Sequence, residues 1–322
     1  MKRDRGLFLW MLLAGAGTAV AQEKPDNVLT PTDILEAAQI SLTGAFRLSL
    51  GGADLRDKDG GWKLDVDTEG YDLFFEAGVG LGRGFEIVAS VPYEIRGLVE
   101  GESGGVEYDV ESYRFGDLTL QGNYRILKEE KETPQWVAGV ILVAPVGYWK
   151  EADPTIRVGG TTIVEGDKGG TGEGVWRYGL GTAISKRFGL FEPYLGGAFL
   201  FGGETERKDI EYDRPDVGQV FVGAEFHVSP EAAIDVRGEV QFTGEQVETD
   251  KETGGESTEE KHQTYILTAQ VYARLAPGVT LFAGGGLYTI SDHWVNREDR
   301  MELEGHLAYV LQMGLQVVLG GW

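Results

Sequence analysis

Apolar and polar residues alternate with a period of two along most of this sequence. In residues 303–320, for example, Leu311 and Met313 flank Gln312. Successive side chains of a β-strand point to opposite faces, so each such segment predicts a strand with one apolar and one polar face. Twelve segments are predicted as strands: 39–50, 70–82, 84–97, 113–126, 135–148, 174–187, 192–204, 216–228, 232–246, 263–275, 278–291 and 303–320.

The connections between these segments alternate strictly between short and long. The long ones are rich in Asp, Glu and Gly, and they cover 51–69, 98–112, 149–173, 205–215, 247–262 and 292–302. Outer-membrane barrels have an even number of strands, short periplasmic turns and long external loops. A soluble β-sandwich would not require this alternation. The sequence therefore predicts an all-β fold, a closed antiparallel transmembrane β-barrel of about 12 strands with short periplasmic turns and long acidic external loops.

The first 21 residues have the features of a secretory signal peptide. A basic head is followed by an apolar run of about ten residues, which is too short to span a bilayer as a helix, and Ala19-Val20-Ala21 fits a cleavage site. We expect a signal peptide at 1–21, a periplasmic segment at 22–38 and the barrel at 39–322. Asp33 and Glu36 have capping-box spacing, so 22–38 either begins a short helix that plugs the periplasmic mouth or is a simple leader.

Composition narrows the function classes. The chain has a net charge of −23, which disfavours nucleic acid as a partner. It contains no cysteine, so the strand ladder and side-chain packing must stabilise the fold without disulfides. Outside the signal there is no apolar run near the ~20 residues of a membrane-spanning helix.

Aromatic residues are placed as expected for a membrane barrel. Trp149, Trp176 and Trp294 fall at the external ends of predicted strands, and Trp136 falls near the short turns. Two aromatic girdles suit the two membrane interfaces. The chain ends on Trp322, which is similar to the C-terminal aromatic signal read by the barrel-assembly machinery. We expect outer-membrane lipid and that machinery as partners, and the bacterial outer membrane as the location.

The predicted inward face is strongly charged. The candidate pore-lining residues are Glu94, Arg96, Asp117, Arg125, Arg177, Asp235, Arg237 and Glu239. Isolated buried charge is costly, so these groups must either sit in water or pair with one another. In the first case the charges set the width and selectivity of a pore, and in the second they close the lumen. Twelve strands lie between barrels that are filled and barrels that are open, so both alternatives remain.

No residue pattern predicts catalysis, a metal site or a cofactor. The four histidines, His227, His262, His293 and His306, have no recognisable serine and orienting acid beside them in sequence, although pairing of the last two strands would allow His306 to face Ser291. The stretch Asp57–Gly60 imitates part of a calcium loop, but Leu55 would occupy the first ligand position. We therefore expect no enzyme, no cofactor and solvated acid in the loops.

Residues 113–190 resemble a known family. The segments Phe115–Arg125, Ala144–Gly147, Trp176–Gly181 and Ser185–Gly189 are similar to segments of the outer-membrane transporters grouped as "MetA-pathway of phenol degradation". The resemblance implies a monomeric barrel that passes small hydrophobic or aromatic compounds. The usual Pro-Thr-Gly is Pro145-Val146-Gly147 here.

The sequence thus predicts a channel or transporter for passive passage of small molecules. Two alternatives are a closed structural or binding barrel that acts through its acidic loops, and a lipid-modifying barrel enzyme.

Overall fold

The computed structural model describes residues 33–57, 63–147, 155–166, 168–170, 172, 174–207, 210–251, 254–296 and 301–320. The predicted signal peptide, most of the segment 22–38, Trp149 and Trp322 lie outside these residues. No helix within the described ranges could cross a membrane.

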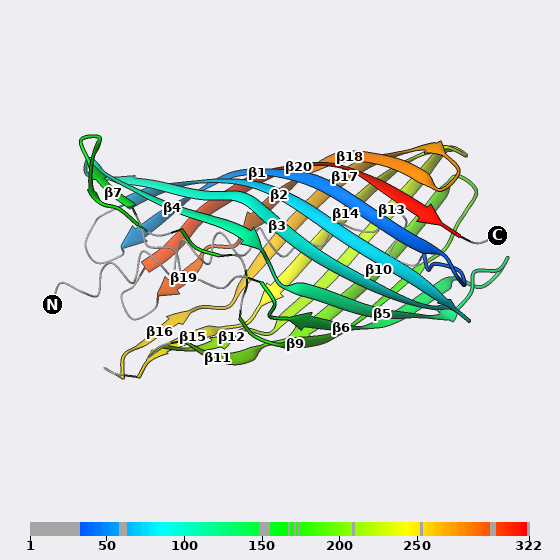
Figure 1. Ribbon diagram of the computed structural model, residues 1–322, viewed down its shortest axis with the longest axis horizontal. Helices are drawn as coiled ribbons and strands as arrows, with labels where there is room; N and C mark the ends of the chain where they lie inside the picture. Colours follow the sequence, from blue (N-terminus) through cyan, green and yellow to red (C-terminus); the bar gives the residue numbers. More distant parts are fainter. Residues whose placement is uncertain are drawn as a thin grey trace.

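Twelve antiparallel strands of the described chain close into a barrel (Figure 1). They are β1 (Ile40–Asp57), β2 (Lys63–Gly82), β3 (Phe85–Ser103), β5 (Leu118–Leu127), β6 (Gln135–Ala144), β9 (Arg177–Ser185), β10 (Phe191–Phe201), β13 (Val217–Ser229), β14 (Ala232–Thr243), β17 (His262–Ala276), β18 (Val279–Ile290) and β20 (Met301–Leu319). Each pairs with its neighbours in chain order, the last pairs with the first, and the β2–β3 pairing completes the ring. The closed barrel that the sequence predicts is confirmed.

Each of the twelve predicted segments overlaps one barrel strand. β1, β2 and β3 run beyond their segments by six or seven residues, so much of the predicted long loops 51–69 and 98–112 is strand. The segment 113–126 differs in another way, because it covers the end of a further strand, β4 (Val106–Phe115), and most of β5. Both pair with β3, and the ladder is interrupted between them at Gly116 and Asp117. The backbone N–H of Gly116 donates instead to the carbonyl of Pro92.

The two faces of the barrel wall differ as period-two alternation requires. On β20, Tyr309 and Leu311 expose 54% and 59% of their surface, whereas Ala308 exposes 1%. On β14, Ile234 and Val236 are exposed, whereas Asp235 and Arg237, which alternate with them, are buried. A wall that presents apolar side chains outward and buries polar ones inward is the surface of a membrane-spanning barrel.

The short-turn end contains tight hairpins and the start of the described chain. Arg83 and Gly84 form a two-residue turn in which both φ angles are positive, the conformation that matches strand twist in a hairpin. Residues 33–36 are not helical, so the predicted helix is not found in this part of the segment. Instead, the backbone of this segment hydrogen-bonds to the barrel, because Ala38 N donates to Gly80 O of β2.

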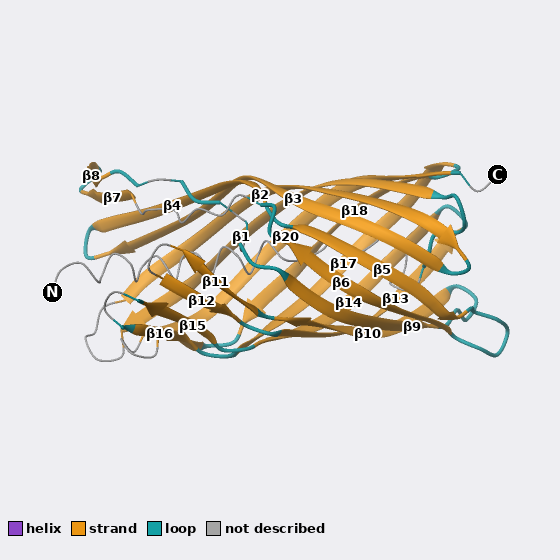
Figure 2. Cartoon of the chain, turned by 60° about the horizontal axis from the view of Figure 1, so that its bottom comes forward, coloured by secondary structure: helices purple, strands orange, loops and turns teal. Residues whose placement is uncertain are grey.

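The long connections contain further strands (Figure 2). These strands lie at the barrel end opposite the short turns. On one side of that end, β4, β7 (Thr155–Val158) and β8 (Thr161–Val164) extend the sheet beyond β3. On the other side, β11 (Gly203–Arg207), β12 (Ile210–Arg214), β15 (Gln246–Asp250) and β16 (Glu256–Glu259) form a separate four-stranded sheet. The short strand β19 (His293–Asn296) pairs with β20. We call the barrel end that carries these additional strands the long-connection end.

An apolar cluster stabilises the long-connection end. It consists of Leu55, Leu64, Val66, Val99, Val110, Met301 and Leu303. Leu55 and Leu64 pair across β1 and β2 and are each only 1% exposed. Leu55, the first ligand position of the partial calcium-loop pattern, is therefore part of a hydrophobic core.

Candidate pore lining

The inner face of the barrel carries buried polar side chains on nine of its twelve described strands. They include Ser41, Thr43, Arg47, Ser49, Asp72, Glu76, Glu86, Ser90, Glu94, Arg177, Ser185, Glu192, Glu225, Asp235, Arg237, Thr264, Gln270 and Gln316. Strand alternation explains the pattern, because residues two apart share a face and neighbouring strands are in register. The carboxylates in this set outnumber the guanidinium groups, so the lining is acidic.

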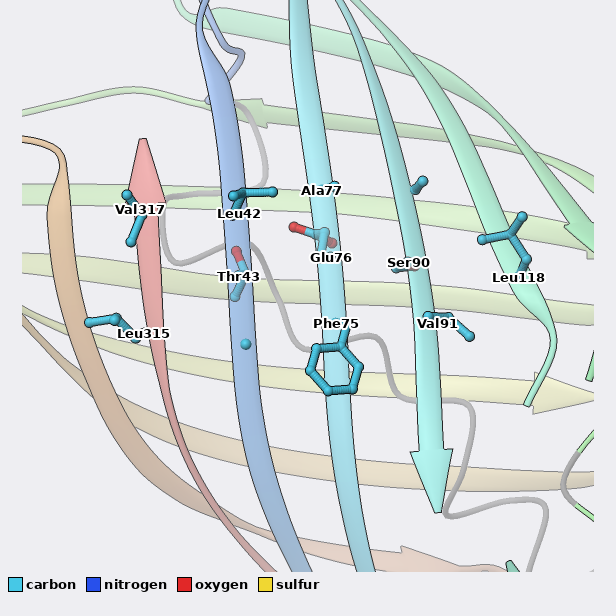
Figure 3. Close-up of a pocket in the computed structure, with 12 residues that line it drawn as sticks. Leu42, Thr43, Phe75, Glu76, Ala77, Ser90, Val91, Leu118, Leu315 and Val317 are labelled. Carbon is cyan, nitrogen blue, oxygen red and sulfur yellow. The ribbon is translucent and has the colours of Figure 1, made fainter. Parts of the chain in front are cut away.

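One part of this lining follows the wall formed by β1, β2 and β3 (Figure 3). Thr43, Glu76 and Ser90 are paired positions on these three strands and are all buried. Their sequence neighbours are exposed or half-buried. Together with Thr43, Glu76 and Ser90 and with residues of β5 and β20, they line a mostly apolar depression: Leu42, Gly44, Phe75, Ala77, Ala89, Val91, Leu118, Leu315 and Val317. A mostly apolar outer surface suits contact with lipid acyl chains.

Glu94 belongs to a buried charged group on the same wall. It pairs with Asp72, which pairs with Arg47. Arg47 Nε donates to Asp72 Oδ2 at 3.2 Å, and their side chains are only 8% and 6% exposed. A guanidinium beside two carboxylates compensates part of their charge, which would otherwise be costly to bury.

Asp235, Arg237 and Glu239 lie in succession along the inner face of β14. Arg237 Nη2 is 2.7 Å from Glu239 Oε2, and the Arg237 guanidinium lies 4.1 Å from the centre of the Phe221 ring. Asp235 accepts a hydrogen bond of 2.8 Å from the Tyr194 hydroxyl. These three predicted residues are thus brought together, and neighbouring side chains fix their positions.

A third charged group lies towards the short-turn end. His227 Nε2 is 3.4 Å from Glu192 Oε2, and His227 Nδ1 is 3.2 Å from Glu225 Oε1. Ser185 donates to Glu192 at 3.0 Å. The alternation of β13 predicts Glu225 and His227 on the inner face, whereas Glu192 was missed by sequence reasoning.

Arg125 connects the lining to the segment that precedes β1. Its Nη2 donates to Ile34 O, and its Nη1 lies 3.1 Å from Glu36 Oε1. On the neighbouring strand, Glu86 accepts from Leu35 N at 2.9 Å. Residues 34–36 are therefore held against the inner wall at the short-turn end.

Two further predicted residues contact the irregular parts of the wall. Asp117 lies at the interruption between β4 and β5 and accepts a hydrogen bond of 3.0 Å from Gly147 N. Arg177 is 2% exposed and donates from Nη2 to Pro215 O at 3.0 Å. Both side chains bind backbone groups, so each also fixes the path of a connecting segment.

The structure places Arg96 outside the lining. A β-bulge between Glu94 and Gly97 changes the register, so Arg96 pairs with Tyr71 and its side chain is 47% exposed. Its Nη2 lies 3.3 Å from Glu111 Oε1. A hydrogen bond from Lys168, with Arg96 nearby, holds the pKa of Glu111 below its ordinary value. The extra residue of a bulge turns the following side chains to the other face, which simple alternation cannot anticipate.

Aromatic residues also project into the interior, and sequence reasoning did not single them out. Phe74, Tyr272 and Phe282 are buried and belong to one cluster with Ala45 and Ala233. The Phe282 ring packs over Gly314, where an added Cβ would meet the ring. The glycine at this position thus leaves room for an aromatic ring inside the barrel.

Within the described residues, His306 is not arranged as the base of a hydrolase site with Ser291. Ser291 Oγ accepts a hydrogen bond from Gln263 N, whereas His306 packs against the Tyr288 ring with 5.1 Å between ring centres. Neither ring nitrogen of His306 has a hydrogen-bond partner in the described part of the chain. The pairing of His306 with Ser291 that the sequence allowed is therefore not formed.

Known structures share this architecture. The chain is similar to the COG4313 outer membrane channel from Pseudomonas putida F1, with 14% identity, a TM-score of 0.56 and coverage of 90% of this chain and 99% of that chain. The fold is that of an outer-membrane β-barrel. The transport unit of the autotransporter AIDA-I from Escherichia coli is also similar, with 8% identity, a TM-score of 0.50 and coverage of 98% of this chain and 99% of that chain.

No protein-family model matches the sequence, and a search of curated proteins finds no relative. The resemblance to outer-membrane transporters is thus supported by the fold. At these identities the likeness concerns the fold alone, since a channel and a transport unit with different roles share it.

Proposed function

We propose that this protein is an outer-membrane channel for the passive passage of small molecules. The observation that carries the proposal is the set of buried polar and charged side chains on the inner face of nine of the twelve strands of a closed barrel. A barrel with a purely structural role would be more stable with an apolar interior, because buried charge requires compensation. In a channel, buried charges are compensated by the other polar groups of the lining, by water and by the passing solute.

The lining also suggests a solute class. Acidic residues predominate in it, and the long-connection end carries further acid, so anions are disfavoured at both places. The inward rings of Phe74, Tyr272 and Phe282 provide apolar contact. We infer that the solutes are small and either neutral or cationic, with aromatic or hydrophobic compounds among them, in agreement with the family resemblance. Glu94, Asp117, Arg125, Arg177, Asp235, Arg237 and Glu239 would set pore charge and width.

Purified protein in planar bilayers tests this proposal. We expect discrete conductance steps, and in a KCl gradient a reversal potential that shows preference for K⁺ because the lining is acidic. Proteoliposomes should also swell in solutions of small neutral solutes. Silent bilayers together with liposomes that do not swell would refute the channel.

The second candidate is a closed barrel that acts through its long connections. The observation that favours it is the low exposure of the paired charges, such as Arg47 with Asp72. If the barrel is closed and acts in this way, removal of the β11–β12 hairpin should abolish the function of the protein. If the protein is a channel, the same removal should leave solute flux intact. We propose no catalytic role, and a change in lipid turnover in His306 or His227 variants would argue for an enzyme instead.

Residues 22–38 would narrow the periplasmic mouth in this proposal. The contacts of Leu35 with Glu86 and of Glu36 with Arg125 support this assignment. We further propose that the lipid of the outer membrane surrounds the barrel and that the assembly machinery reads the C-terminal strand ending in Trp322.

A further inference from the structure

Two histidines and a glutamate from three different strands meet at the long-connection end. Glu259 ends β16, His262 begins β17 and His293 begins β19. One potential ligand atom from each side chain lies within 4.8 Å of the other two. The two imidazole rings are stacked with 4.3 Å between their centres. Neither the sequence motifs nor the proposed transport explains this arrangement.

The hydrogen bond of His293 determines which of its nitrogens is available. His293 Nδ1 lies 2.8 Å from Ser291 O, a carbonyl that can only accept, so Nδ1 carries the proton. In the neutral ring Nε2 then presents a lone pair, and this nitrogen lies 3.4 Å from Glu259 Oε1. A histidine that donates one N–H to a carbonyl and presents the other nitrogen is the usual arrangement at protein metal sites.

His262 approaches the same carboxylate oxygen. Its Nδ1 lies 3.5 Å from Glu259 Oε1. The same Nδ1 also lies 3.4 Å from the carbonyl oxygen of Glu260, so an ion bound here would replace that contact and use the other tautomer of His262. One nitrogen of each imidazole thus lies close to the same carboxylate oxygen. The side chains of His262, His293 and Glu259 are 9%, 3% and 19% exposed, so bulk water reaches them poorly. A cation between them would be coordinated by all three side chains.

We propose that Glu259, His262 and His293 bind one divalent transition-metal ion of the Zn²⁺ class. Imidazole nitrogen and carboxylate oxygen suit Zn²⁺, Ni²⁺ and Cu²⁺, whereas Ca²⁺ and Mg²⁺ prefer oxygen alone. Three protein ligands leave room for water in the remaining position.

The site would join parts of two long connections. Glu259 belongs to the connection between β14 and β17, and His293 to the connection between β18 and β20. Their backbones meet where Glu260 N donates to Trp294 O at 2.7 Å. A bound ion would therefore fix the position of the four-stranded sheet relative to the barrel rim. The acidic residues nearby, Glu256 and Glu260, raise the local concentration of cations.

The full-length protein in detergent, stripped with EDTA, provides the test. Isothermal titration with ZnCl₂ should show one ion bound per chain at micromolar concentration or below. His262→Ala and His293→Ala should each weaken binding by about tenfold or more, since loss of even an outer-sphere partner of a metal ligand costs about 10–100-fold. His227→Ala, at the opposite end of the barrel, should bind Zn²⁺ as the unaltered protein does.

Electron paramagnetic resonance of the Cu²⁺-loaded protein gives an independent readout. The spectrum should show coupling to two nitrogen donors, reduced to one in either single histidine variant. The absence of stoichiometric Zn²⁺ binding, or equal affinity in the His262→Ala/His293→Ala double variant, would overturn the proposal. Neither measurement depends on conductance, so failure of the metal site and failure of the channel are distinguishable.

Discussion

Replacement of Arg47 by Met should destabilise the barrel by roughly 3–5 kcal/mol, because removal of one partner from a buried ion pair leaves an uncompensated charge. Asp72 would lose its guanidinium partner, while the carboxyl group of Glu94, its paired residue on β3, would still lie beside it. Equilibrium urea unfolding of the protein reconstituted in liposomes, followed by tryptophan fluorescence, measures the loss.

Two variants separate burial from the simple loss of an ion pair. Arg96→Met removes a guanidinium that is 47% exposed and paired with Glu111, and such surface pairs contribute only about 0–1 kcal/mol. The double variant Arg47→Met/Asp72→Leu removes both charges and should recover most of the stability. Equal, small losses for Arg47→Met and Arg96→Met would show that water solvates Asp72 and that the pair is not buried.

Removal of residues 22–37 behind the signal peptide should increase single-channel conductance several-fold. Residues 34–36 are held against the inner wall by Glu86 and Arg125, so their loss should widen the periplasmic mouth. Planar-bilayer recordings of the purified variant measure the change. Heat-dependent mobility in gels shows separately that the shortened chain still forms a barrel.

Point variants refine this test. Arg125→Ala removes the contacts to Ile34 O and Glu36 and should reproduce part of the increase. Lys128→Ala, close by and of the same charge but exposed, should leave the conductance unchanged. A folded, shortened barrel with unaltered conductance would show that the segment does not restrict the pore.

Much of the fold follows from alternation and connection length. Tyr309 and Leu311 face outward and the charged residues of β14 face inward as their spacing requires. Strand alternation has a period of two whatever the tertiary context, so a long strand reveals its two faces without further information. The order of the strands then follows from the short turns, which force consecutive strands to pair.

Local irregularities limit the same reasoning. Arg96 lies outside the lining because the bulge after Glu94 shifts the register by one residue. The predicted segment 113–126 combines two strands, because the apolar pattern continues through Gly116 and Asp117 while the ladder does not. Such breaks depend on contacts with distant residues, here Pro92 and Gly147, that no local pattern contains.

Contacts between distant segments explain what was missed at the site. Glu259 and His293 are separated by two barrel strands in sequence and meet only because β16 and β19 extend from the same rim. Phe282 occupies the lumen because Gly314 on the next strand provides space for its ring. Neither neighbourhood has a sequence motif.

The most direct test of the account uses single cysteines along β17, since the chain has none of its own. Leu267 and Val271 are each 53% exposed on the outer face, whereas Thr268 and Gln270 are on the inner face. In planar bilayers, a charged, membrane-impermeant thiol reagent should change the conductance of Thr268→Cys and Gln270→Cys and leave Leu267→Cys and Val271→Cys unaffected. Reaction at the outer positions, or no effect at either inner position, would contradict a lipid-embedded barrel with a polar path through its centre.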